Sequence, residues 1–149
     1  MVSDARRYPS LLVSRPPGDG TGSPVLPSIS NRSPSGASRR TSRPDGYGYW
    51  RDHGHQTDFF LEYDRGTETL DRVAAKLNGY QDLQRASQRT TPVLFSLPTT
   101  DRERALRDKL RWTPVPVATT NRTWHPEPTG AAWLPLNSQK RCRLARVPR

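Results

Sequence analysis

Apolar residues and cysteine are both scarce in this sequence of 149 residues. Hydrophobic residues make up 32% of it, and Cys142 is the single cysteine, so no disulfide bond can form within the chain. No window approaches the roughly 18 apolar residues of a membrane span, and the N-terminal residues lack the apolar segment of a signal peptide. These absences exclude a disulfide-stabilised scaffold and argue against a membrane protein. We expect a cytoplasmic location.

Lysine is also rare, with three residues, so arginine carries most of the net charge of +10. That charge lies at the two ends: residues 1–43 and 138–149 each carry +5, and residues 44–137 are neutral. Basic ends can bind nucleic acid by neutralising phosphates and releasing counterions; the alternative is a solvated, disordered end. The candidate nucleic-acid-binding residues in these ends are Arg39, Arg40, Arg141 and Arg143.

The composition divides the chain into three parts. Residues 1–43 contain ten serines and six prolines, and such a segment buries too little apolar surface to offset its ordering entropy. We predict a disordered arm there; a misassigned gene start is the alternative. Residues 44–137 have the composition of one small folded domain, and residues 138–149 are predicted to be a basic tail.

Apolar patterning predicts alternating strands and helices between residues 44 and 137. Two strands precede a helix over 68–86 that Thr67 would cap, and a second helix capped by Thr100 or Asp101 follows the next strand. Pro116 predicts that the strand after it lies at a sheet edge. This order predicts a small α/β domain, with a mixed sheet and flanking helices. The predicted strands are 47–51, 57–63, 92–98, 115–119 and 131–136.

Three acidic residues lie at the ends of the predicted hairpin and give the strongest indication of a functional site. Asp45 lies in a turn before the first strand, and Glu62 and Asp64 end the second strand at i and i+2 spacing, which places their side chains on one face. Three converging carboxylates would suit Mg²⁺ and metal-assisted phosphodiester chemistry. The alternative is ordinary acids at a turn and a strand end.

The acidic pattern over Pro44–Leu97 resembles the core of the PD-(D/E)xK nuclease superfamily. The resemblance implies a restriction-endonuclease-like fold in which Asp45 and Glu62 hold the metal. Asp64 occupies the position where that superfamily usually has lysine. Lys76, on the following helix, would replace that lysine if its side chain points toward the acids; the alternative is a surface lysine, since Lys76 lies next to the apolar positions Ala75 and Leu77.

A more specific resemblance, over residues 44–137, is to the replication-relaxation family. It rests on Pro44–Tyr47, Phe60–Leu70 and Pro92–Phe95. The resemblance implies a role in plasmid replication and in relaxation of plasmid DNA. Members usually carry an upstream winged-helix region, whereas residues 1–43 show no helical apolar period, so a protein partner would supply that region.

The sequence therefore predicts a DNA-associated protein acting on double-stranded plasmid DNA, with Asp45, Glu62, Asp64 and Lys76 as candidate catalytic residues. Asp45 and Glu62 would bind Mg²⁺, and Arg65 would contact phosphate. Whether the chain is an enzyme stays open at this stage. The alternatives are a non-catalytic DNA- or protein-binding module and a truncated, inactive remnant of a longer family member.

Overall fold

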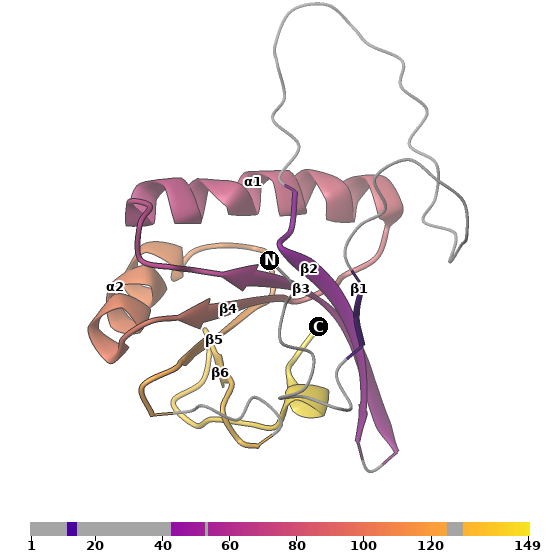
Figure 1. Ribbon diagram of the computed structural model, residues 1–149. Coiled ribbons are helices and arrows are strands. Elements are labelled where there is room, and N and C mark those ends of the chain that lie inside the picture. The colour runs from indigo at the N-terminus through magenta and orange to yellow at the C-terminus, as the bar shows by residue number, and fades with distance from the viewer. Residues whose placement is uncertain (1–11, 15–42, 53, 125–129) are drawn as a thin grey trace, which may run out of the picture.

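A computed structural model describes residues 12–14, 43–52, 54–124 and 130–149 (Figure 1). They form one sheet, two α-helices and a short 3₁₀ helix. The strands are β1 (Leu12–Ser14), β2 (Gly46–Asp52), β3 (His55–Tyr63), β4 (Val93–Leu97), β5 (Val117–Asn121) and β6 (Leu134–Pro135). The helices are α1 (Leu70–Ser87), α2 (Thr100–Leu110) and η2 (Leu144–Arg146).

The six strands lie in the sheet in the same order as in the sequence. β1, β2 and β3 are antiparallel neighbours, β3, β4 and β5 run parallel, and β6 pairs antiparallel with β5. Parallel neighbours need a crossover connection, which α1 supplies between β3 and β4 and α2 between β4 and β5. The expected α/β class with a mixed sheet and two helices is confirmed.

The core has two layers, one on each face of the sheet. The helices cover one face, and the chain from β6 through η2 covers the other (Figure 1). The buried residues of the helical layer are Val73, Leu77, Tyr80, Val93, Phe95, Leu97, Leu106, Leu110, Val115 and Val117. Those of the other layer are Trp50, Phe59, Leu94, Ala118, Ala132, Trp133, Leu144 and Val147.

Both helices begin at different residues from those predicted. The Thr69 hydroxyl accepts a hydrogen bond from the backbone N–H of Arg72, so Thr69 caps α1 in place of Thr67. Gly66, with φ of 80°, turns the chain between β3 and that cap. Thr99 caps α2 in place of Thr100 or Asp101. Neither helix in the described part of the chain has the length and apolarity needed to cross a membrane.

The strand predicted at the sheet edge lies in the interior instead. It spans Val117–Asn121 and pairs with both β4 and β6. Pro116 precedes it, so the missing N–H of proline falls outside the strand, and the Pro116 carbonyl accepts a hydrogen bond from Val93. The edge assignment was therefore wrong, and the last strand is shorter than predicted.

Two segments expected outside the domain contribute to the sheet or its packing. Leu12–Ser14, within the predicted arm, pairs with β2 as β1; the rest of the arm lies outside the described residues. In the predicted basic tail, Leu144 and Val147 are 1% and 6% exposed. Residues 138–149 thus pack on the sheet as part of the domain.

Candidate functional site

A buried carboxylate on β3 lies at the centre of the candidate site. Glu62 is 2% exposed, and its two carboxylate oxygens accept hydrogen bonds from two residues of α1. Nζ of Lys76 lies 2.9 Å from Oε2 of Glu62, and the Tyr80 hydroxyl donates to Oε1. A charge is tolerated in an interior when it is paired and hydrogen-bonded, so these contacts stabilise the carboxylate there.

Helical spacing brings both donors to Glu62. Lys76 and Tyr80 are four residues apart, which places them on one side of α1. The Tyr80 ring is fully buried and stacks at a tilt against Phe60, with 5.2 Å between ring centroids. Lys76 also approaches Glu68, with 3.3 Å between Nζ and Oε2. The side chain of Lys76 therefore points toward the acid, as the nuclease-like pattern requires.

Asp45 joins this cluster through the backbone of β3. It is exposed and precedes β2, and its Oδ2 accepts a hydrogen bond of 2.8 Å from the backbone N–H of Tyr63. Its charge is near enough to contribute to the raised pKa of Glu62. We name Asp45, Glu62, Lys76 and Tyr80 the acid–lysine cluster.

Burial and ion pairing together determine the protonation behaviour of the cluster. Burial raises the pKa of Glu62 above its ordinary value, against the opposing effect of the hydrogen bonds from Tyr80 and Lys76. Burial alone would lower the pKa of Lys76, but the bonds and charges of Glu62 and Glu68 outweigh it and raise that pKa. Burial and the charge of Glu62 also raise the pKa of Tyr80, so its hydroxyl remains a donor.

Asp64 does not converge with the other two acids. Its carboxylate binds the guanidinium of Arg102 on α2 and accepts the backbone N–H of Gly66 at 2.8 Å. Burial alone would raise the pKa of Asp64, but the bonds from Arg102 and Gly66 lower it overall. In the described part of the chain, no three His, Cys, Asp or Glu residues form a group that could hold a metal ion. The expected convergence of three carboxylates was therefore wrong.

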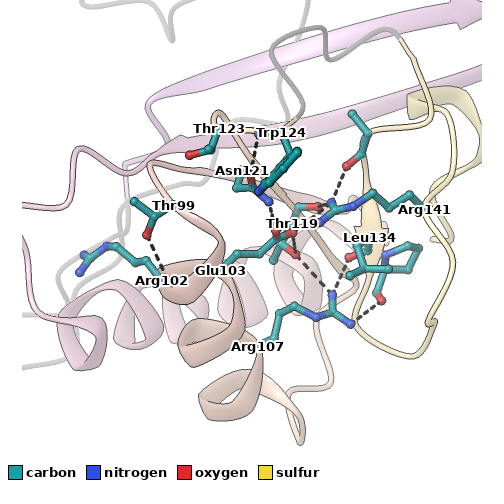
Figure 2. A network of polar contacts seen from close by, with 12 residues as sticks. Thr99, Arg102, Glu103, Arg107, Thr119, Asn121, Thr123, Trp124, Leu134 and Arg141 are labelled. Atoms are coloured by element: carbon teal, nitrogen blue, oxygen red, sulfur yellow. Dashed lines mark hydrogen bonds and ion pairs between the residues drawn. The ribbon is translucent and has the colours of Figure 1, made fainter.

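A second buried acid, Glu103, was missed by the sequence reasoning. It is 2% exposed on α2, and Thr119 and Asn121 of β5 donate to its two oxygens (Figure 2). Arg141 adds a bidentate ion pair, in which its two terminal guanidinium nitrogens lie 3.1 Å from Oε1 and 2.8 Å from Oε2 of Glu103. A signal was present in the sequence, because Glu103 shares the helical spacing of the buried Leu106 and Leu110.

The arginines predicted to bind nucleic acid have different surroundings. The Arg141 guanidinium is held inside the domain by Glu103 and the Ala132 carbonyl. Arg143 is half-exposed and lies 3.4 Å from Asp52. Arg65 is exposed at the end of β3. Arg39 and Arg40 lie outside the described residues.

The fold and the site define a small α/β domain with a buried glutamate–lysine pair where its parallel strands end. The replication-relaxation family model matches residues 28–95, so this part of the chain is similar to that family. The match begins before the expected residue 44 and ends at Phe95, so it includes the whole acid–lysine cluster but not Glu103 or Arg141. Comparison with curated proteins and with solved structures gave no match.

Proposed function

We propose that this chain acts on plasmid DNA through Mg²⁺-dependent phosphodiester chemistry at the acid–lysine cluster. The observation that supports this most is the contact of 2.9 Å between Lys76 and the buried Glu62. Glu62 of β3 contacts Lys76 of α1, and Asp45 binds the backbone of the next residue in β3, Tyr63. Two acids and a lysine are the combination that the nuclease-like pattern requires. A winged-helix region supplied by a protein partner remains part of the proposal.

The donor set fits Mg²⁺. This ion is usually bound by one or two carboxylates, with water and phosphate oxygens completing its coordination. Asp45 offers an exposed carboxylate, and Glu62 retains acceptor capacity, because a carboxylate has about four lone-pair sites. When bound, the ion would lower the pKa of a water molecule and neutralise charge on the phosphate.

The protein residues would take distinct roles around that ion. Asp45 and Glu62 would hold it. Lys76, with its raised pKa, remains an ammonium and would stabilise negative charge on the phosphate, a role that requires no proton transfer. Asp64 would position α2 through Arg102 and would not be a metal ligand.

Conversion of supercoiled plasmid to nicked or relaxed DNA tests the proposal. The full chain is assayed with Mg²⁺ or Mn²⁺ and compared with Glu62→Gln, which keeps the shape but removes the charge. Asp82→Asn is the matched control, because Asp82 is an exposed acid on α1. We expect metal-dependent conversion that is lost in Glu62→Gln and retained in the control. Wild-type protein that never converts plasmid would refute the catalytic role.

One observation favours a second candidate, a non-catalytic DNA-binding module. Both oxygens of Glu62 are already hydrogen-bonded, and the side chain is 2% exposed, as in a purely structural cluster. Such a module would bind DNA with a strong salt dependence and without cleavage, and the slope against salt would report the phosphates neutralised. An inactive remnant would neither bind nor cleave.

A further inference from the structure

An aromatic and basic surface lies where β3, β4 and β5 end. Its members are Tyr63, Arg65, Arg122 and Trp124, and we name it the stacking surface. Tyr63 is 48% exposed and Trp124 is 72% exposed. Neither ring is buried in the core, whereas other aromatic side chains of the domain, such as Phe95 and Tyr80, are fully buried.

The Arg122 guanidinium packs against one face of the Tyr63 ring. Its guanidinium carbon lies 4.2 Å from the ring centroid, a cation–π contact. The same guanidinium donates to the backbone carbonyls of Ser96 at 2.7 Å and Asp64 at 2.8 Å, so it is anchored to β4 and to the end of β3. Tyr63 is thereby a supported ring that still presents aromatic surface to solvent.

The turn after β5 places Trp124 at the same edge of the sheet. The Arg122 backbone N–H donates to the Leu97 carbonyl, and the Thr123 hydroxyl donates to the Pro98 carbonyl, each at 3.0 Å. The backbone N–H of Trp124, just beyond the end of β5, donates a hydrogen bond to Oδ1 of Asn121, also at 3.0 Å (Figure 2). The backbone is therefore fixed while the indole remains exposed.

Arg65 supplies an available cation two residues after Tyr63. It is exposed, and its side chain makes no hydrogen bond or ion pair with any residue in the described part of the chain. Tyr63 and Arg65 are exposed, and Asp64 between them is buried. The side chains of Tyr63 and Arg65 therefore both face solvent. A guanidinium in this position can bind a phosphate with two parallel hydrogen bonds.

We infer that the stacking surface binds unpaired nucleotides of single-stranded DNA. A base would stack on Tyr63, a second on Trp124, and Arg65 would bind the phosphate. Exposed rings favour a single strand because each unpaired base has a free face, whereas duplex bases offer only their edges in the grooves. This rests on the proposed function, in which the chain acts on DNA. Tyr63 directly follows Glu62 in β3 and its backbone N–H donates to Asp45, while its ring projects to the opposite face of the sheet from Glu62.

Binding in EDTA tests the inference separately from catalysis. Fluorescence anisotropy measures the affinity of the full chain for labelled oligothymidylate of about 20 nucleotides and for a duplex of the same length. We expect Tyr63→Ala to weaken oligothymidylate binding about tenfold, whereas Tyr63→Phe keeps the stack and changes the affinity less than about twofold. Tyr49→Ala, at an exposed tyrosine on β2, is the matched control.

The outcomes separate the inference from the proposed function. Equal loss in Tyr63→Ala and Tyr63→Phe, or no loss in either, would overturn the stacking role. If Tyr63→Ala weakens duplex binding as much as single-strand binding, the inferred preference is also wrong, while a DNA-associated function stands. Wild-type protein that binds neither DNA would overturn the inference, and the plasmid-conversion assay with Mg²⁺ would then decide the proposed function by itself.

Discussion

Nζ of Lys76 lies 2.9 Å from Oε2 of Glu62, although 14 residues separate them in the sequence. The contact joins an internal strand to the helix that covers it and is supported by Tyr80 from the next turn. Since Glu62 is buried, each of its donors offsets part of the cost of removing a carboxylate from water. The cluster is therefore sensitive to small changes.

Replacing Tyr80 by phenylalanine should destabilise the protein without changing its shape. The change removes the hydrogen bond to Oε1 of Glu62 and leaves a buried acceptor unpaired, which costs about 1–3 kcal/mol. Urea unfolding measures the free energy. Tyr49→Phe, at a tyrosine that is 40% exposed, should change it by less than about 0.5 kcal/mol. Equal effects in the two variants would contradict the buried bond.

Arg141 and Arg143 should behave differently despite their proximity in the sequence. Arg141→Ala leaves the buried Glu103 carboxylate without its cation, which should cost about 3–5 kcal/mol of unfolding free energy. Arg143→Ala removes an exposed pair with Asp52, worth less than about 1 kcal/mol. Thermal or urea unfolding measures both. Similar losses would show that Arg141 does not stabilise the interior.

Glu103 should contribute to stability that is lost in acid. Burial alone would raise its pKa, but the bonds from Arg141, Asn121 and Thr119 lower it below the ordinary value of 4.5. The unfolded chain therefore binds a proton at a higher pH than the folded one, and the contribution falls as the pH drops below about 4.5. Glu103→Gln should show a smaller fall in unfolding free energy between about pH 6 and pH 3 than the wild type.

Glu62 should have the opposite pH dependence, because its pKa is raised. Its contribution is fully present below the unfolded pKa and is lost as the pH rises through the folded one. Relative to the wild type, Glu62→Gln should therefore gain stability as the pH rises above about 4.5. Parallel pH curves for Glu62→Gln and Glu103→Gln would contradict the different environments of the two acids.

Gly48 on β2 should not tolerate a side chain. A Cβ atom there would lie 2.3 Å from Cζ of Phe59, a side chain that is 1% exposed. Gly48→Ala should cost about 1–3 kcal/mol through overpacking. Combining it with Phe59→Leu tests the cause in a double-mutant cycle. The double variant should lose less than the sum of the single variants; strict additivity would place the cost elsewhere.

Local patterns were sufficient to predict most of the fold. The apolar spacing of α1 and the apolar composition of β3 and β4 predicted those elements, because burial on one face imposes the period of a helix or strand. The predicted caps were wrong, since several threonines competed for each helix start. The packing of residues 138–149 was missed because their charge obscured two buried residues, Leu144 and Val147.

The candidate site was predicted only in part. Asp45, Glu62 and Lys76 were identified from the order of acids and lysine along the chain, and the structure brings Glu62 and Lys76 into contact. Strand alternation correctly placed Glu62 and Asp64 on one face, but it could not show that Arg102 would bind Asp64. The partner of each acid depends on how the two helices pack.

The sequence by itself determined the α/β class, the similarity of residues 28–95 to the replication-relaxation family and the order of the charged residues. These properties depend on local periodicity and on residue order. The tertiary structure alone decided which acid pairs with Lys76, which with Arg102 and which with Arg141. The physical reason is that an ion pair across 14 to 38 residues forms only after the sheet and helices have brought its partners together.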